Sequence, residues 1–175
     1  MAKAVHEVYG GEPPWHELDW FTQESNRAAA DFIPAMLMLA HITEEDAMNT
    51  GTLTKDQTLA EILAQTEKLR WNAFHAVMGY HSISIKEMQR RFEIYDGERN
   101  FRKHLDFSRR DSKARLHVCL ASWDELDEIS EAYRELARRA GDPKEEKRNF
   151  KDNDRDIVGS IPQFLKVAKG GMNCD

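Results

Sequence analysis

The sequence predicts an all-α protein. Apolar residues recur at three- and four-residue spacing wherever a period can be read, which is the pattern of amphipathic helices. Val, Ile and Thr form no sustained alternating run bounded by turn residues, so an extended sheet is not expected. The 175 residues are 41% hydrophobic and 32% charged, which is typical of a globular chain long enough for one ordinary domain.

Five segments carry the helical period. We expect helices over residues 17–40, 55–79, 84–95, 123–140 and 154–168. The sequences TKDQ at 54–57 and SWDE at 122–125 combine a hydroxyl with acids that suit the positive end of a helix. Gly79 and Gly141 lie where two of these helices should end. The segment 96–121 has no clear period, and we expect a long ordered central loop there.

Two stretches of the chain echo one another in the same order. The sequence WHELD at 15–19 returns as WDELD at 123–127. The sequence NRAAADFIPAML at 26–37 returns as DRDIVGSIPQFL at 154–165. A repeated helical unit usually forms two halves, each of which covers the apolar stripe of the other. We therefore expect a pseudo-twofold arrangement.

A proline takes the same place in both copies of the echo. Pro34 and Pro162 each lack a backbone donor, so each helix is expected to be kinked there or to begin there. A kink that serves packing is the simpler interpretation, because helix breakers in repeats more often shape a fold than bind a ligand.

An ordered set of short motifs runs through the rest of the chain: LAE at 59–61, EKLRWNAF at 67–74, GY at 79–80, RLHVCL at 115–120, WDEL at 123–126 and NDR at 153–155. This set resembles the RyR repeat, which occurs in ryanodine receptors and as small domains in bacterial proteins. The resemblance implies an all-α RyR-like domain over 15–168, made of one and a half repeats. Residues 59–168 are then a complete repeat with insertions, and 15–40 are the second half of another. Residues 1–14 become an N-terminal extension and 169–175 a flexible tail.

The resemblance also implies a function, that of a non-enzymatic ligand-sensing or adaptor module. Tandem RyR repeats are similar to modules that receive nucleotide-like ligands between their halves, so a small anionic or nucleotide-like ligand is expected. An indole face can stack on a base, and a guanidinium offers a planar fork of donors to phosphate. The residues that the resemblance brings to such a pocket are Trp71, Arg70, Asn26, Arg27, Asn153, Asp154, Arg155 and His117.

A structural interpretation of the same residues stays open. Trp71 can be a core residue, and the two arginines have acidic neighbours with which they can pair: Glu24 or Asp31 for Arg27, and Asp152 or Asp156 for Arg155. The chain is then a protein–protein interaction module with no small-molecule site. Its charged insertion at 138–150 would contact a partner protein.

No pattern in the sequence points to catalysis, a metal or a cofactor. The seven His residues include no HExxH motif and no pair four residues apart on one helix face. His117 beside Cys119 lacks a third, orienting group, so a hydrogen-bonded loop histidine is the simpler interpretation. Glycine-rich phosphate loops are missing. We therefore predict a protein that is not an enzyme and uses no cofactor or metal.

Charge and hydropathy bear on partners and location. The net charge of −6 disfavours nucleic-acid binding in general. Residues 86–115 carry ten basic and six acidic side chains with interleaved aromatics, which in outline is the pattern of a surface that binds single-stranded nucleic acid. A loop that packs its aromatics inward explains this pattern equally well. The richest apolar run, at 32–40, is too short for the roughly 20 residues that cross a bilayer. With two cysteines and no disulfide framework, we expect a cytoplasmic protein without a membrane span.

Overall fold

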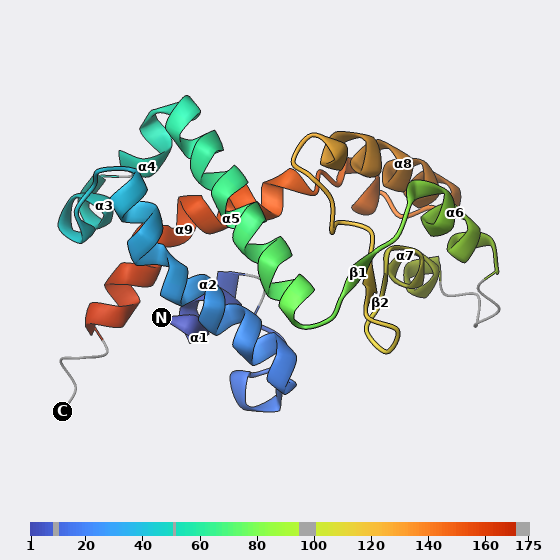
Figure 1. The fold of residues 1–175 in the computed structure, drawn as a ribbon, viewed down its shortest axis with the longest axis horizontal. Coiled ribbons are helices and arrows are strands. Elements are labelled where there is room, and N and C mark those ends of the chain that lie inside the picture. The colour runs from blue at the N-terminus through green and yellow to red at the C-terminus, as the bar shows by residue number, and fades with distance from the viewer. Residues whose placement is uncertain (9–10, 51, 95–100, 171–175) are drawn as a thin grey trace. The chain divides into compact units, whose positions relative to one another are not determined.

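The computed structural model describes residues 1–8, 11–50, 52–94 and 101–170, and this part of the chain is mainly helical (Figure 1). Its helices, in chain order, are α1 (Ala2–Val8), η1 (Trp15–Glu17), α2 (Trp20–Leu39), α3 (Glu44–Thr50), α4 (Thr52–Lys55), α5 (Gln57–Val77), α6 (Ile85–Ile94), α7 (Phe101–Arg109), α8 (Glu125–Ala140), η2 (Glu145–Lys147) and α9 (Lys151–Gly170). Its strands are β1 (His81–Ser82), β2 (Arg110–Asp111) and β3 (Leu116–His117). The mainly helical structure confirms the predicted all-α class.

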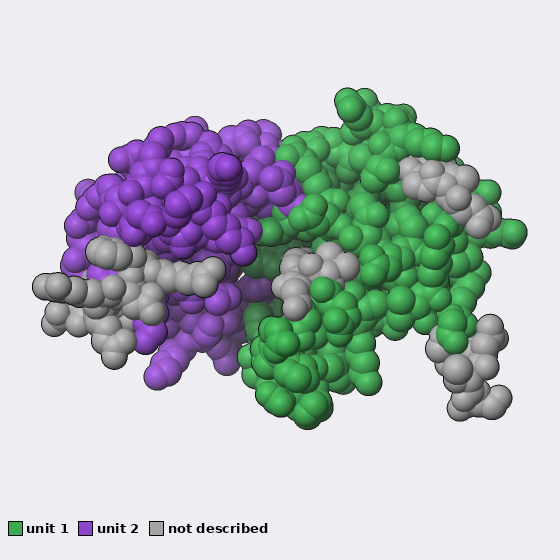
Figure 2. Space-filling model, turned by 180° about the vertical axis from the view of Figure 1, so that it is seen from behind, with its two compact units in different colours: residues 1–74, 153–175 green, residues 75–152 purple. Residues whose placement is uncertain are grey.

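The chain divides into two compact units (Figure 2). Unit 1 comprises residues 1–74 and 153–175, and unit 2 comprises residues 75–152. Unit 1 is therefore discontinuous in sequence, because unit 2 is formed by the segment between its two parts. The long helices α5 and α9 each contribute residues to both units.

The core of unit 1 is built from the apolar faces of its long helices. Ile33 of α2, Leu63 of α5 and Phe164 of α9 are fully buried. Burying one such side chain stabilises the folded state by about 1.5–3 kcal/mol. The rings of Phe21 and Phe74, whose centroids are 5.4 Å apart, join α2 to α5. The helical period in the sequence thus marks the faces that meet in this core.

The echoed stretches bury the same positions. Residues 26–37 lie in α2 and residues 154–165 lie in α9, both within unit 1. The buried residues of the two stretches match place for place: Asn26, Ala29, Ala30, Ile33, Met36 and Leu37 in the first, and Asp154, Ile157, Val158, Ile161, Phe164 and Leu165 in the second. Neither helix begins at its proline, because Pro34 and Pro162 both lie inside the helix.

The first parts of the echo differ in local structure. Residues 15–19 lie in unit 1 and end at Asp19, whose side chain caps α2 by accepting from the Thr22 amide at 2.8 Å. Residues 123–127 lie in unit 2 and run directly into α8. The pseudo-twofold arrangement of repeat halves therefore stays a prediction.

Helix ends follow the predicted chemistry closely. Ser122 and Glu125 form a reciprocal capping box, with the Ser122 hydroxyl accepting from the Glu125 amide and the Glu125 carboxylate accepting from the Ser122 amide. Gly141 ends α8 with a φ of 67°, and Gly79 follows α5 with a φ of 77°. At the start of α5 the cap is the Asp56 carboxylate, which accepts from two backbone amides.

Short helices occur outside the five predicted ones. Within residues 1–14, α1 packs on α2 and buries Ala4, Val5 and His6. Helices α3 and α4 precede α5, and their seven and four residues are too few for a period to be read. At the other end, α9 reaches Gly170, and the rest of the predicted tail, 171–175, lies outside the described residues.

Unit 2 has regular structure where the sequence predicted a loop. Over the described part of 96–121 that prediction is wrong, because 101–121 contains α7, β2 and β3. Helix α7 has nine residues and buries only Leu105 and Ser108 among the side chains described for it, so its periodic signal is weak. Each strand has two residues, which is below the length at which alternation can be read.

A small three-stranded sheet in unit 2 includes β2, the strand that directly follows α7. The strand order is β1-β3-β2, with β1 parallel and β2 antiparallel to β3. Leu116 of β3 pairs with His81 on one side and with Asp111 on the other. A turn over residues 112–115 joins β2 to β3.

Across the ranges described above, no helix is both long enough and apolar enough to cross a bilayer.

Candidate functional site

The structure places the predicted ligand-binding residues in two different units. Asn26, Arg27, Arg70, Trp71, Asn153, Asp154 and Arg155 belong to unit 1, and His117 belongs to unit 2. Several of the unit 1 residues gather where α5 and α9 meet. We define the α5–α9 charge cluster as Glu67, Lys68, Arg70, Asp154 and Arg155, which are linked by hydrogen bonds or by electrostatic interaction.

Glu67 and Arg70 form the buried pair of the cluster. Two hydrogen bonds join them, from Arg70 Nε to Glu67 Oε2 at 2.8 Å and from Arg70 Nη2 to Glu67 Oε1 at 2.6 Å. The Arg70 side chain is 9% exposed and the Glu67 side chain 1%, so little solvent screens the pair. Burial raises the pKa of Glu67 above its ordinary value, and the hydrogen bond and charge of Arg70 oppose that rise only in part. Arg70 Nη1 is buried and has no hydrogen-bond partner among the described residues.

Asp154 is the second buried carboxyl of the cluster, and it is only 7% exposed. Burial raises its pKa to about 7, with Lys68, Arg70 and Arg155 opposing the shift and Glu67 adding to it. The Asp154 carboxyl therefore changes charge near neutral pH.

The remaining predicted residues of unit 1 make local or cross-helix contacts. Arg155 donates to Glu61 of α5 from Nε at 3.0 Å and from Nη2 at 2.9 Å. Arg27 pairs with Glu24, as the structural interpretation expected. Asn26 is buried and donates to the carbonyl of Thr22 at 2.8 Å.

The environment of Trp71 is polar on one face. The ammonium of Lys68 lies 4.3 Å from the centre of the indole ring and donates to Asn72 Oδ1 at 2.9 Å. The indole is half-buried, as is Asn153. The Lys68 ammonium thus lies over the indole ring on which a base was expected to stack.

His117 lies in the small sheet of unit 2. Its Nδ1 accepts from the Cys119 amide at 3.0 Å, and its ring meets that of His75 edge-on at 6.1 Å between centroids. The hydrogen bond agrees with the expectation for this histidine, but His117 lies in β3 and not in a loop. No group of three or more metal-ligating side chains converges anywhere in the described ranges.

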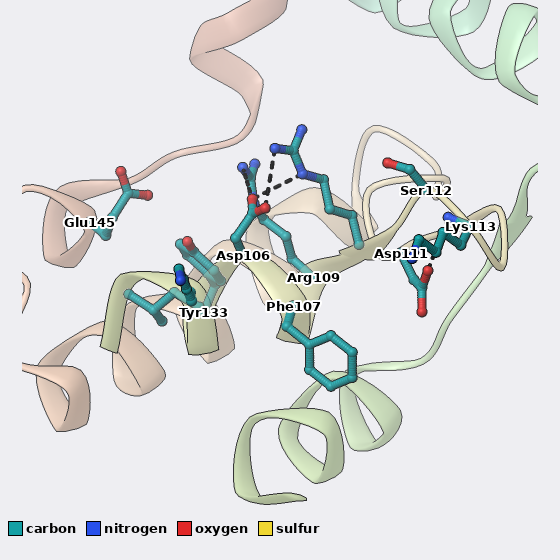
Figure 3. Close-up of a pocket in the computed structure, with 11 residues that line it drawn as sticks. Asp106, Phe107, Arg109, Asp111, Ser112, Lys113, Tyr133 and Glu145 are labelled. Atoms are coloured by element: carbon teal, nitrogen blue, oxygen red, sulfur yellow. Dashed lines mark hydrogen bonds and ion pairs between the residues drawn. The ribbon is translucent and has the colours of Figure 1, made fainter. Parts of the chain in front are cut away.

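A cavity of about 730 Å³ lies in unit 2, and its lining includes none of the predicted residues (Figure 3). It opens over α7, β2 and the 112–115 turn, with one residue each from α8 and η2. Its lining residues are Lys103, Leu105, Asp106, Phe107, Arg109, Arg110, Asp111, Ser112, Lys113, Tyr133 and Glu145. The volume is within the roughly 300–1,000 Å³ of small-molecule sites.

Asp106 is a lining residue whose carboxylate is held by two guanidinium groups (Figure 3). Its Oδ1 receives Arg109 Nη2 and Arg110 Nε, each at 2.9 Å, and its Oδ2 receives Arg110 Nη2 at 3.2 Å. Burial alone raises the pKa of Asp106, but the charges and hydrogen bonds of Arg110 and Arg109 outweigh it and hold the pKa below its ordinary value. Asp106 is therefore an anion at neutral pH.

The other two carboxylates of the lining are neutralised from outside it. Asp111 Oδ2 lies 3.3 Å from Arg91 Nη2, and Glu145 Oε1 lies 2.7 Å from Arg148 Nη2. The lining thus holds four cations, Lys103, Arg109, Arg110 and Lys113, and Asp106 is the carboxylate that its own arginines hold by hydrogen bonds. The cavity has an excess of positive charge in a protein whose net charge is −6.

Two polar groups of the cavity wall differ in whether they are already hydrogen-bonded. Arg109 Nε is buried and has no partner among the described residues. The Tyr133 phenol is kept protonated, because burial and, to a lesser extent, Glu145 raise its pKa above the ordinary value. The Tyr133 hydroxyl is hydrogen-bonded to Glu145, so Arg109 Nε is the unpaired donor of the two.

A buried arginine of α6, Arg91, contacts the end of α7. Arg91 donates from Nε to the carbonyl of Phe107 at 3.0 Å and lies 4.1 Å from the centre of the Phe107 ring. A second donor reaches the carbonyl of Arg110 at 3.5 Å. Because these carbonyls end α7, Arg91 caps that helix and fixes the direction in which β2 leaves it.

One sequence signal did point toward this cavity. The excess of basic residues at 86–115 includes Arg109, Arg110 and Lys113, but the prediction of a loop gave them no fixed geometry. Asp106 precedes the two arginines by three and four residues, which is the spacing of side-chain pairs on a helix. A prediction of helix α7 would therefore have placed Asp106, Arg109 and Arg110 next to one another.

No family model matches the chain, and no curated protein or solved structure matches it either. The RyR-like resemblance therefore stays a prediction that rests on the sequence motifs alone.

Proposed function

We propose that the chain is a non-catalytic binding domain and that its unit 2 cavity receives a small anionic ligand. The observation that carries this proposal is the arrangement of Arg109, Arg110 and Lys113 in the lining of a cavity of about 730 Å³, two of whose three carboxylates pair with arginines outside it. Planar guanidinium forks suit carboxylate and phosphate oxygens, and partial burial strengthens each charge-assisted bond. The ligand is expected to enter the side of the cavity on which Asp106 lies.

The proposal keeps the functional class that the RyR-like resemblance implies and adds a second location. A ligand-sensing or adaptor module needs a site that binds without chemistry, and the cavity offers cations and donors without a nucleophile–base pair. Trp71, Arg70 and their neighbours remain predicted ligand residues in unit 1. Their charges are already paired with Glu67 and Glu61, so an anion has less to gain there.

A thermal-shift titration with phenyl phosphate tests the proposal. A ligand at about 100 times its Kd adds ~2.7 kcal/mol to stability, which raises the melting temperature of a domain this size by roughly 5–10 °C. The substitution Arg110→Met should abolish the shift, because it removes a donor of the cavity. Arg110 is 48% exposed, so the change leaves the core intact.

A matched control is available on α6. Arg90 is also an exposed arginine paired with a carboxylate three residues away, but it lies outside the cavity lining. Arg90→Met should leave the phenyl phosphate shift unchanged. Equal loss of the shift in both variants refutes the cavity as the site. So does the absence of a shift in the wild type at phenyl phosphate concentrations up to 10 mM, because a Kd of 1 mM corresponds to a binding free energy of only ~4 kcal/mol.

A protein–protein interaction module is the second candidate, and an exposed apolar face of α5 favours it. Ile62 and Leu69 lie seven residues apart on this helix and are 51% and 68% exposed. Under this candidate no small anion stabilises the protein, and Leu69→Ser is the variant that affects function. The wild-type phenyl phosphate titration therefore separates the two candidates.

A further inference from the structure

The Asp106 carboxylate occupies the place in the cavity where the donors converge. Three donor nitrogens from Arg109 and Arg110 lie within 3.2 Å of its two oxygens. A carboxylate held by two guanidinium groups is also the arrangement that an anionic ligand would adopt there. The Asp106 and Arg110 side chains are both 48% exposed, so water and solutes can reach this pair.

We propose that Asp106 is an internal stand-in for the anionic group of the ligand, which displaces it from Arg109 and Arg110 on binding. This inference rests on the proposed function. The displacement is energetically feasible, because an exposed ion pair shifts an equilibrium by no more than about fivefold. Asp106 also keeps the two arginines together in the empty cavity, where their like charges would otherwise drive them apart.

The stand-in selects the chemical class of the ligand. A carboxylate tethered next to its partners has an effective concentration of about 1 mM or more, so a monocarboxylate in solution gains nothing by replacing it. A phosphoryl group carries a charge of about −1.5 to −2 at neutral pH and has three acceptor oxygens. It can hold both guanidinium groups and still reach a further donor.

Further donors lie around the same place. Arg109 Nε is buried beside the pair and has no partner among the described residues, and the Lys113 ammonium belongs to the lining on the turn. In Figure 3 the Ser112 hydroxyl points to the side of the cavity where Asp106 receives its hydrogen bonds. We therefore assign the cavity to ligands with a phosphoryl dianion rather than a monocarboxylate.

A positioning role for Asp106 makes the opposite prediction. If Asp106 only orients Arg109 and Arg110 for the ligand, its removal must weaken anion binding. If Asp106 competes with the ligand, its removal must strengthen it. The sign of the change in affinity for one probe thus decides between the two roles.

Isothermal titration with phenyl phosphate and with benzoate provides that sign. For Asp106→Asn we expect phenyl phosphate to bind about three- to thirtyfold more tightly than to the wild type, because two ion pairs no longer compete with it, and benzoate to become detectable. The control is Glu128→Gln on α8, which removes one exposed charge of the same unit outside the lining. The control should change either affinity by less than about twofold, because a distant exposed charge is screened by salt.

Folding of the variants is checked by their melting temperatures, and Asp106→Ala is the second variant in case the asparagine alters α7. Weaker binding in both Asp106 variants overturns the stand-in, as does a gain no larger than that of Glu128→Gln. In those cases loss of binding in Arg110→Met still upholds the proposed function. Absence of phenyl phosphate binding in the wild type and in every variant overturns both proposals.

Discussion

The substitution Asp154→Asn removes a buried carboxyl. Burial disfavours the ionised form of this group and raises its pKa to about 7. Asn is nearly isosteric with Asp, and the echoed position in α2 already carries Asn26, which is equally buried. The variant therefore keeps the shape of the side chain and loses its charge. It tests the balance of burial and charge in the α5–α9 charge cluster without creating a cavity.

The sign of the effect follows from the raised pKa. The Asp154 pKa is about 7 in the folded protein and 3.8 in the unfolded chain, so the folded state holds its proton more tightly. Below about pH 3 both states are protonated and the group has no effect on stability. As the pH rises to 7 the unfolded state loses its proton first, so the free energy of unfolding of the wild type falls. Above pH 7 both states are ionised, and the full cost of burying the charge is present.

The magnitude comes from the same two values. Each pKa unit is worth 1.36 kcal/mol, so the cost of the buried charge is about 4 kcal/mol as an upper bound. Relative to the wild type, Asp154→Asn should be more stable by no more than about 1 kcal/mol at pH 4.5 and by roughly 2–4 kcal/mol at pH 8.

Urea unfolding at pH 4.5, 6, 7 and 8 measures this difference directly. Asp156→Asn is the matched control, because Asp156 is exposed on the same helix and the change should stay within about 0.5 kcal/mol. A stability difference for Asp154→Asn that is the same at all four pH values would refute the reasoning. So would a loss of stability at pH 8, which would mean that Lys68, Arg70 and Arg155 outweigh burial.

Two further predictions concern single contacts in unit 2. Ser130→Ala should destabilise the protein by about 1–3 kcal/mol in urea unfolding. The buried Ser130 hydroxyl accepts from the Phe150 amide at 3.0 Å, and its loss leaves that donor unpaired. A change in the free energy of unfolding below about 0.5 kcal/mol would contradict this. Gly141→Ala should lower stability by about 1 kcal/mol, because Gly141 ends α8 at a φ of 67° that a side chain strains. No atom lies within 4 Å of a Cβ at this position, so an unchanged melting temperature would show that the backbone relaxes.

The long helices could be predicted from the sequence because their core faces repeat over several turns. The period in 17–40, 55–79 and 154–168 gave α2, α5 and α9 to within three residues at each end. The two echoed stretches proved to bury the same six positions, which follows from the shared period. Helix α7 and the three strands carry too few residues for such a signal, and contacts far apart in sequence hold them in place, such as Arg91 with the carbonyls that end α7.

The sites were less accessible to sequence reasoning than the helices. The pair of Arg27 with Glu24 was foreseen because the two residues are one helical turn apart. The bond of Arg155 to Glu61 joins residues 94 positions apart, and no local pattern reveals it. The unit 2 cavity depends on α7, the 112–115 turn, α8 and η2 at once. Its charge excess arises because Arg91 and Arg148 neutralise two of its carboxylates, which only the fold discloses.

The location of the anion site is tested most directly by the arginine Nε–H resonances in a ¹H–¹⁵N spectrum during titration with phenyl phosphate. Arg109 Nε is buried in the cavity wall without a partner among the described residues, whereas Arg70 Nε already donates to Glu67. We predict a saturable shift of the Arg109 resonance, assigned through Arg109→Lys, and no shift of the Arg70 resonance. A saturable shift at Arg70 with Arg109 unchanged would contradict the assignment of the site to unit 2 and would return it to the α5–α9 charge cluster.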